Sequence, residues 1–557
     1  MSGTTERLLP KVDELGIESR FLATLEMIVR WAVSADKITS ISDAAWIAGV
    51  RALHAHEEGH TCISLEGERK IMKELKALDS LVATGASVAR GTRRPFVLDG
   101  TDLYVARAFD EESSIATDFV RMMSEGRLKV ILGGPGTGKT TRVAALLVKR
   151  FTDPSIDPDL TVLAAPTGKA ADRMRKAIEV ALDRGDEKGT PYPADVKERV
   201  RAVRAVTVHR LLGYAPSPRP PRKRFRHCSE NPLPHDLVII DETSMMPMSL
   251  MYRVLRALRS DTTDRNGAKL ILVGDPDQLA SVESGSVLGD LRSAAVPGSP
   301  LGSVTEKLEV QYRFKAESPI GVLISAIKLG DSARVLEILQ AHRGGGSHEL
   351  EFIDPEHDLE AYARLADEVR NHAIDLRDAA RRGDDTGALA LKSMLQILCA
   401  HRHGRSGVGN WNHAVNEWIG ERGRKPWFAG RPVLVTRNDY VNEVFNGDVG
   451  VVVVGANQKL VVAFPGADDS LFIDPERLGN LETVHALTIH KSQGSEYDHA
   501  IVILPQGGSR LLTRELLYTG ASRAKKRLTI VGSSAVVAAA VETTVARATR
   551  LDRRLGS

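Results

Sequence analysis

The sequence predicts an α/β protein with two parallel-sheet domains, a helical N-terminal domain and a small β insertion. Three observations carry this prediction. Short apolar runs alternate with helical stretches from residue 130 to about 313, and the pattern returns after residue 484, as in parallel sheets with helical crossovers. Residues 1 to about 95 show apolar side chains at helical spacing. Residues 430–480 contain short β runs separated by Asn-Gly, Gly-Ala-Asn and Pro-Gly turns.

Length and composition limit the class of protein. A chain of 557 residues is too long for one hydrophobic core and should form three or four domains. The net charge of +3 is nearly balanced, so any nucleic-acid binding must come from local basic patches. Cys62, Cys228 and Cys399 form no C-x-x-C pair, which indicates a reducing compartment and no zinc site. Without a signal-peptide pattern or a membrane-length apolar run, we expect a cytoplasmic protein with no membrane partner.

The N-terminal region, residues 1–110, carries no pattern typical of catalysis. Phe21, Leu25 and Ile28 recur at the spacing of an amphipathic helix. A polar turn at 91–95 precedes two short β-like runs at 96–98 and 103–105. We therefore expect this region to pack against the rest of the chain or to dock a partner.

The strand at 130–132 runs into a glycine-rich loop and then a helix. This strand–loop–helix order is the context in which G-x-x-x-x-G-K-[ST] forms a phosphate-binding P-loop. Backbone N–H groups of the loop and the helix N-terminus surround phosphate oxygens, the lysine reaches the β- and γ-phosphates, and the hydroxyl after it can bind Mg²⁺. The nucleotide-binding residues predicted are Gly133, Gly134, Pro135, Gly136, Thr137, Gly138, Lys139, Thr140 and Thr141.

Three further strands each end in polar residues. The strand at 237–240 ends in Asp241 and Glu242, a pattern typical of a Mg²⁺-shell carboxylate followed by the base that activates water. The strand at 269–273 is followed by Gln278, which we expect to sense the γ-phosphate. Pro166 and Thr167 follow the strand at 161–165. Because ligands collect at the carboxyl ends of parallel strands, we expect these groups to gather at one edge.

The strongest basic run of the chain lies at residues 217–227. It places Arg222, Arg224 and other cations among prolines, with one phenylalanine. A solvated loop remains an alternative. Basic residues interleaved with an aromatic ring favour contact with single strands, so we predict a phosphate-contacting excursion at about 214–236.

The second half of the chain has a sheet pattern but no P-loop. Residues 316–395 are predicted to be helical, and strands are expected at 396–401, 484–489, 500–504 and 528–531. A helix ahead of the last strand is predicted to carry Arg523, which could complete a nucleotide site from across a cleft. Cys399, His401 and His403 alternate along a strand, but no further ligand at suitable spacing supports a metal site.

The ordered set of motifs resembles the RecD family of superfamily 1 DNA helicases, in which RecD is the α subunit of the RecBCD exodeoxyribonuclease V. The segments that carry the resemblance are GGPGTGKTT, APTGKAA, TVHRLLG, IIDETSMM, GDPDQLASVESG, VQYRF, NGDVG, TIHKSQGSEY and LLYTGASRA, over about residues 96 to 535. The resemblance implies two RecA-like domains, at 111–315 and at 316–430 with 481–557. It also implies a pin-like insertion around Arg224 and an SH3-like insertion at 431–480.

The resemblance assigns roles to individual residues. It implies an ATPase site with Mg²⁺, formed by Lys139, Thr140, Asp241, Glu242, Gln278, Arg313 and Arg523. Tyr312 would stack on adenine, and Gly494 and Glu496 would approach the γ-phosphate and ribose. Single-stranded DNA would contact Pro166, Thr167, His209, Thr488 and His490, with the basic residues Arg222 and Arg224 near the fork.

The family also implies partners. The chain would be a DNA-dependent ATPase and helicase, moving 5′ to 3′ on single strands from duplex ends in recombinational repair. It would join RecB-like and RecC-like subunits, docking through residues 1–110, and nuclease activity would belong to a partner. Two alternatives stay open: a stand-alone RecD-like helicase, and a scaffold subunit that grips DNA with weak ATPase. A P-loop kinase is disfavoured because one such sheet would suffice and HKSQG would have no role.

One departure from the family pattern concerns base recognition. Relatives carry a Gln before the P-loop to read adenine, whereas residues 113–127 contain none. This puts the selectivity for ATP over other nucleotides in question.

Overall fold

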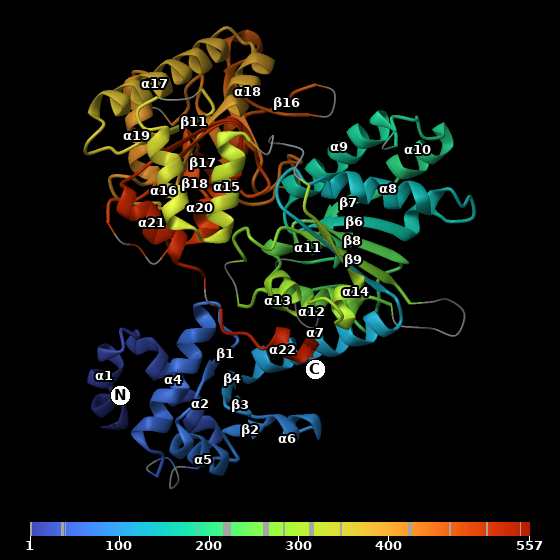
Figure 1. The fold of residues 1–557 in the computed structure, drawn as a ribbon, viewed down its shortest axis with the longest axis vertical. Helices are drawn as coiled ribbons and strands as arrows, with labels where there is room; N and C mark the ends of the chain where they lie inside the picture. Colours follow the sequence, from blue (N-terminus) through green and yellow to red (C-terminus); the bar gives the residue numbers. More distant parts are fainter. Residues whose placement is uncertain are drawn as a thin grey trace.

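The computed structural model describes residues 3–556 except 35–37, 39, 187, 216–223, 260–266, 282–283, 311–316, 346–347, 422–425, 440, 467–468, 508, 510 and 546. The described chain forms an N-terminal domain, a first parallel-sheet domain and a second parallel-sheet domain that carries a β insertion (Figure 1). Arg222, Tyr312 and Arg313, three residues with predicted roles, lie outside the described residues.

The N-terminal domain combines helices with a four-stranded sheet. Its elements are α1 (Gly3–Glu14), α2 (Ser19–Ala32), α4 (Asp43–Glu57), β1 (Cys62–Ser64), α5 (Arg69–Ala77), β2 (Val82–Thr84), α6 (Gly85–Ala89), β3 (Phe96–Asp99) and β4 (Asp102–Val105). The sheet order is β1-β4-β3-β2. Strands β3 and β4 confirm the two predicted β runs, whereas β1 and β2 interrupt a region predicted as helical. Three-residue strands are too short to show a period of two, and their pairing partners lie elsewhere in the sequence.

The first parallel-sheet domain has six strands in the order β10-β5-β9-β8-β6-β7, all parallel. The elements are α7 (Ala106–Ser124), β5 (Leu128–Gly133), α8 (Lys139–Phe151), β6 (Thr161–Ala165), α9 (Gly168–Arg184), α10 (Ala194–Arg201), β7 (Arg204–Thr207), α11 (Val208–Leu211), β8 (Leu237–Ile240), α12 (Met248–Ala257), β9 (Lys269–Gly274), α13 (Val287–Ala294), α14 (Pro300–Val304) and β10 (Thr305–Leu308). The four predicted strands are confirmed as β5, β6, β8 and β9. Because β5, β9 and β8 are neighbours, the loops that follow them meet at one edge.

The second domain has a five-stranded parallel sheet in the order β11-β20-β19-β12-β18. Its elements are α15 (Pro319–Leu329), α16 (Ser332–Ala341), β11 (Leu350–Ile353), α17 (Leu359–Arg381), α18 (Asp385–Met394), β12 (Leu395–Cys399), α19 (Val408–Trp418), β18 (Ala486–Thr488), β19 (Tyr497–Ile503), α20 (Arg514–Ala521), β20 (Ala524–Val531) and α21 (Ser534–Glu542). The predicted strands are confirmed. Strand β11 lies inside the stretch predicted as helical, because four residues carry too little pattern to reveal an edge strand.

The β insertion between α19 and β18 is a five-stranded antiparallel sheet in the order β16-β15-β14-β13-β17. Its strands are β13 (Pro432–Val435), β14 (Val449–Val454), β15 (Leu460–Phe464), β16 (Leu471–Ile473) and β17 (Leu481–Thr483). The first four match the predicted runs. Buried valines on both faces of β14 pack against two clusters, one shared with α17 and α18 and one inside the insertion.

The C-terminal segment departs from the predicted boundary, which placed all of 481–557 in the second domain. After α21 the chain returns to the first domain, where α22 (Leu551–Gly556) lies beside α7 (Figure 1). Leu551 and Leu555 are buried in the first domain's core. Arg550 pairs with Asp102 at 2.6 Å, which ties the segment to the N-terminal domain as well. Two leucines at i, i+4 reveal an apolar helix face, but not which core buries it.

No helix among the described residues is long and apolar enough to cross a bilayer.

Candidate nucleotide site and the cleft between the domains

The P-loop joins β5 to α8 in the conformation that its glycines permit. Gly136 and Gly138 adopt φ values of 72° and 83°, a region that L side chains rarely occupy. A Cβ at Gly133 would lie 2.3 Å from Thr137 Oγ1, so only glycine fits there. Thr137 Oγ1 in turn donates to the Gly134 carbonyl at 2.9 Å. The loop is therefore a shaped cradle rather than a chance glycine-rich turn.

Lys139, the first residue of α8, turns its ammonium back over the cradle. Its Nζ donates to the carbonyls of Gly133 at 2.7 Å and Gly134 at 2.8 Å. Both contacts are to neutral oxygens, so the positive charge stays available to an anion in the cradle. The N-terminus of α8 adds partial positive charge from the same direction. This cradle fits a phosphate group.

The carboxylates after β8 stand next to this cation. Burial, with the nearby Glu242 carboxylate, raises the pKa of Asp241 to about 6, while Lys139 opposes that rise. Asp241 Oδ1 accepts the backbone N–H of Glu242 at 2.8 Å. Glu242 itself has φ 51°, one of four described non-glycine residues with positive φ. A left-handed glutamate at a strand end is a strained arrangement of the kind that functional sites retain.

The loop after β9 holds a second buried carboxylate that sequence reasoning missed. Asp275 is fully buried and Gln278 is 5% exposed. Gln278 Nε2 donates to Asp275 Oδ2 at 2.9 Å, whereas Gln278 Oε1 is buried with no hydrogen-bond partner among the described residues. An unsatisfied buried amide oxygen costs free energy unless a ligand or water completes it. Because this oxygen accepts hydrogen bonds, it can bind a water beside the γ-phosphate, which is compatible with the predicted sensing role for Gln278.

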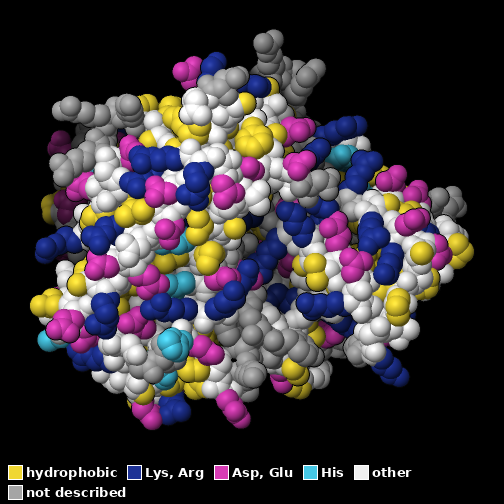
Figure 2. All heavy atoms as spheres, turned by 90° about the horizontal axis from the view of Figure 1, so that it is seen from above, with side chains coloured by type: hydrophobic (Ala, Val, Ile, Leu, Met, Phe, Trp, Pro, Cys, Tyr) yellow, Lys and Arg dark blue, Asp and Glu magenta, His cyan; other side chains and the backbone are white. Residues whose placement is uncertain are grey.

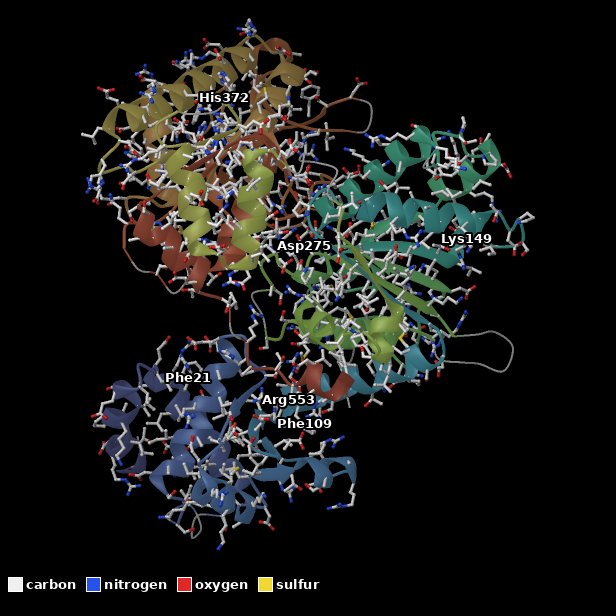
Figure 3. All side chains as sticks on the ribbon, in the orientation of Figure 1. Phe21, Phe109, Lys149, Asp275, His372 and Arg553 are labelled. Atoms are coloured by element: carbon white, nitrogen blue, oxygen red, sulfur yellow. The ribbon has the colours of Figure 1, made fainter. Side chains whose placement is uncertain are left out.

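The second domain contacts this same loop through α20. Figure 3 labels Asp275 where the ribbons of the two domains meet. Tyr518 Oη donates to Asp275 Oδ2 at 3.0 Å, and a Cβ at Gly134 would lie 3.2 Å from that hydroxyl oxygen. Tyr518 therefore reaches both the loop after β9 and the P-loop. The motif that contains Tyr518 is visible in the sequence, but nothing local indicates that its hydroxyl crosses to the other domain.

Leu279, also missed from sequence, is held by the second domain on three sides. Its backbone N–H donates to Thr519 Oγ1 at 2.9 Å, and its carbonyl accepts from Gln493 Nε2 at 2.9 Å. Its side chain is buried in the core of the second domain. Any relative movement of the two domains must therefore move the backbone beside Gln278.

Arg523 is buried just beyond α20. Its guanidinium donates to the carbonyls of Thr519 at 3.0 Å and Ser495 at 3.1 Å, and to Ser522 Oγ at 3.1 Å. These contacts place it between α20 and the segment that precedes β19, on the second-domain side.

A cleft of about 730 Å³ separates α9 of the first domain from the second domain and the β insertion. Seven Lys and Arg side chains line it, against four Asp and Glu, among the described residues. Figure 2 shows such cations gathered in the hollow between the two lobes. Lys392 is 6% exposed at this wall, and burial lowers the pKa of its ammonium to about 7. The cleft is suited to an anionic ligand.

Several residues predicted to meet DNA lie in or near this cleft. Thr167 caps α9 by accepting the Ala170 N–H at 3.2 Å. Gly494 and Glu496, which are predicted to contact the nucleotide and not DNA, also line this cleft, and Glu496 pairs across it with Arg173. Thr488 is buried at the end of β18, and burial lowers the pKa of His490.

His209 and Arg224 are not among the described residues that line this cleft. His209 is exposed beside Tyr214, with the ring centroids 5.3 Å apart. Arg224 is exposed at the base of the basic excursion. The single-strand contacts predicted from sequence are thus divided between the cleft and residues outside its lining.

No group of three or more His, Cys, Asp or Glu side chains within the described ranges could hold a metal ion. Thr140 and Asp241 could supply only part of a Mg²⁺ shell. Mg²⁺ usually takes one or two protein oxygens and completes its shell with phosphates and water, so the residues fit a metal that arrives with a triphosphate.

Comparison with known proteins adds family relationships. An AAA domain family model matches residues 117–284, and a UvrD-like helicase C-terminal domain model matches residues 483–531. The RecBCD enzyme subunit RecD of Mycolicibacterium smegmatis is 39% identical over 96% of this chain and 97% of its own length. The ATP-dependent RecD2 DNA helicase of Deinococcus radiodurans is 32% identical over 81% of this chain, but over only 53% of its own length. The crystal structure of Bacteroides Pif1 bound to single-stranded DNA aligns with a TM-score of 0.39 at 16% identity, over 75% of this chain and 93% of that one.

Proposed function

The chain belongs to the RecD family, and on that premise we propose that it is the ATP-dependent DNA helicase motor of a RecBCD-type complex. The single observation that carries the proposal is the contact of α20 with the loop after β9. Through Tyr518 and Leu279, the second domain holds the loop that carries Gln278. A nucleotide at the P-loop would thus affect the first domain directly and the second domain through the loop that carries Gln278.

In this proposal ATP lies with its phosphates in the cradle of Gly133–Thr141. Lys139 exchanges its carbonyl contacts for phosphate oxygens, and Thr140 with Asp241 holds Mg²⁺. Glu242 orients the attacking water and accepts its proton. Gln278, whose amide oxygen has no partner among the described residues, accepts a hydrogen bond from the water that attacks the γ-phosphate. Arg523 supplies positive charge from the second domain when the domains close.

Single-stranded DNA would occupy the cleft between α9, the second domain and the β insertion. The excess of cations there suits a phosphate backbone, and Thr167, a predicted contact, directly precedes Gly168 of the lining. Closure on ATP and reopening after hydrolysis would change the grip on the strand and so move the chain along it. The 5′ to 3′ direction follows from the family, not from this geometry.

We infer that RecB-like and RecC-like subunits are the partners and that the N-terminal domain docks onto them. On α2, Met27 is 67% exposed and Trp31 is 83% exposed, on the face opposite the buried Leu25. Large apolar side chains in such positions favour a protein interface. The stand-alone alternative has less support, because the identity to the Deinococcus RecD2 helicase is 32% over 81% of this chain, against 39% over 96% for the Mycolicibacterium RecD subunit.

ATP hydrolysis by the purified full-length chain, with and without single-stranded DNA, tests the proposal. We expect hydrolysis that DNA stimulates and that Lys139→Ala abolishes. The measurement should be repeated after co-expression with RecB-like and RecC-like subunits. Hydrolysis that DNA does not stimulate, in both preparations, would favour a DNA-gripping scaffold subunit and overturn the motor.

A further inference from the structure

We propose a second single-strand binding surface on the first domain, outside the cleft, formed by the base of the basic excursion and α12. It rests on the proposed function, because it takes the same ligand as the motor. We call it the hairpin-base surface and define it by Tyr214, Phe225, Arg224, Arg253 and Arg256. Tyr214, Arg224 and Phe225 fall within the excursion predicted at about 214–236, whereas α12 with Arg253 and Arg256 has no predicted role above.

A short β-hairpin shapes the surface. Tyr214 and Phe225 pair across its two arms, and Ala215 N–H donates to the Arg224 carbonyl at 2.8 Å. Gly213 starts the hairpin with φ 64°, and a Cβ there would lie 2.7 Å from the Cβ of Arg226. Glycine is therefore required at position 213, where the excursion leaves the domain. The conformation of Gly213 fixes the direction in which the hairpin leaves.

Three aromatic rings meet at the hairpin base. The ring centroids of Tyr214 and Phe225 are 5.0 Å apart, and His209 lies 5.3 Å from Tyr214 and 6.3 Å from Phe225. Tyr214 and His209 are exposed, while Phe225 is half-buried against the first domain's core. Exposed ring faces of this kind can take an unstacked base.

Arginines surround the far side of Phe225. The Arg253 guanidinium lies over the Phe225 ring, 4.6 Å from its centroid. A hollow of about 430 Å³ beside it is lined by Arg224, Arg253 and Arg256 together with Tyr252, and by one carboxylate, Glu230. Arginine stacked on an aromatic ring keeps its N–H groups at the rim, where they can bind phosphate oxygens.

This combination favours a single strand over a duplex. Ring faces can stack only on bases that have left a double helix, whereas duplex phosphates need cations alone. The surface also continues from the cleft, because Thr207 and Arg210 line the cleft while the neighbouring His209 belongs to the aromatic cluster. A strand that leaves the cleft beside α11 would therefore pass over Tyr214 and Phe225 and reach the arginines of α12.

The test uses the full-length chain and oligodeoxythymidines of about 8 and about 24 nucleotides, a range that spans single-strand site sizes. Binding is followed by fluorescence anisotropy at several salt concentrations. In Arg253→Ala/Arg256→Ala we expect the long oligonucleotide to bind about tenfold more weakly. Its slope of log affinity against log salt should fall by about 1.4, the value for two lost phosphate contacts. The short oligonucleotide, which the cleft alone holds, should bind as before.

Phe225→Leu tests the stacking part. It should weaken binding of the long oligonucleotide by about fivefold or more with an unchanged salt slope, because it removes a ring and no charge. A leucine retains apolar packing against the core, and thermal melting checks the fold. Lys149→Ala/Arg184→Ala is the matched control, since it removes two exposed cations from α8 and α9; Figure 3 shows Lys149 on the side of the first domain away from the second.

Cross-linking of the wild-type chain gives an independent readout. An oligonucleotide with 5-iodouracil along its length should attach to Tyr214 or Phe225 after irradiation. Unchanged affinity and salt slope in Arg253→Ala/Arg256→Ala would overturn the surface, as would equal losses for both lengths. A blunt duplex that loses as much affinity as the long single strand would assign the arginines to duplex phosphates instead. Failure of the proposed function looks different: the wild-type chain would then show no DNA-stimulated hydrolysis with either length.

Discussion

Tyr518 of the second parallel-sheet domain donates a hydrogen bond of 3.0 Å to Asp275 Oδ2 of the first domain. The same oxygen accepts the side-chain amide of Gln278 at 2.9 Å. Asp275 is buried, and burial raises the pKa of its carboxyl while Lys139 opposes the rise. One carboxylate oxygen thus joins the predicted phosphate sensor to α20, the helix that precedes Arg523. We therefore expect the state of a nucleotide bound at the P-loop to be linked to the position of α20 through this atom.

Tyr518→Phe should uncouple the two domains with little change in volume. It leaves a buried carboxylate short of one donor, a loss of about 1 to 3 kcal/mol. We expect DNA-stimulated turnover to fall about tenfold or more, with a smaller change in nucleotide affinity. Steady-state kinetics and nucleotide titration measure the two effects. Tyr362→Phe, the same substitution on α17, is the control and should behave as wild type. Equal loss in both variants would remove the Asp275 contact from the mechanism.

Substitutions at the P-loop and after β8 should separate binding from chemistry. Lys139→Ala should abolish DNA-stimulated hydrolysis, because it removes the cation that faces the transferred phosphate. Glu242→Gln should retain ATP binding while turnover falls about 100-fold or more, since only the base is lost. Rapid-quench and binding assays distinguish these outcomes. Wild-type turnover in either variant would contradict the assignment.

Arg523→Ala should reduce turnover by orders of magnitude while ATP binding falls less, as expected for an arginine that acts in the transition state. Because the Arg523 guanidinium also satisfies the carbonyls of Thr519 and Ser495, the melting temperature must be compared. Arg523→Lys separates the two roles, since it retains the charge but not the three-way contact. Parallel losses of binding and turnover would make Arg523 a ground-state ligand.

Met27→Ser/Trp31→Ser should release the chain from RecB-like and RecC-like subunits without loss of its own ATPase. Both side chains are exposed on α2, so their replacement exposes no core. Size-exclusion chromatography after co-expression reports assembly. Deleting residues 1–95 is a poorer test, because the Thr61 N–H donates to the Ala548 carbonyl at 2.9 Å and the deletion would remove this contact with the C-terminal segment. A complex that survives the double substitution would place the interface elsewhere.

Asp290→Asn should make the chain more stable than wild type, by an amount that increases as pH rises. Burial raises the pKa of Asp290 to about 8, and only Oδ1 has a hydrogen-bond partner among the described residues, Thr549 at 2.7 Å. A carboxyl with a raised folded-state pKa stabilises the fold below its unfolded pKa, and that stabilisation is lost as pH rises toward 8. The apparent melting temperature of the variant should therefore exceed that of wild type by a margin that grows from pH 5 to pH 8. A constant margin would show that Asp290 does not titrate in this range.

The sequence by itself determined the local parts of the site. The P-loop, the carboxylates after β8 and the strands that carry them depend on contacts within about ten residues, so their pattern is readable along the chain. The proximity of these loops to one another also follows from the parallel sheet, because parallel strands end at a common edge. The main β runs of the insertion were visible for the same reason, since each strand follows its neighbour through a short turn.

Only the tertiary structure decided how the two halves meet. Asp275 and Tyr518 are 243 residues apart, and no local pattern pairs a given carboxylate with a given hydroxyl. Leu279 and Leu551 are apolar in the sequence, but hydrophobic burial is non-directional and does not specify which core receives a side chain. Leu279 enters the second domain's core from the first domain, and Leu551 returns from the chain's end to the first domain. Which core buries Leu279 and which buries Leu551 depends on the shape of the packed domains and on the connectivity of the whole chain.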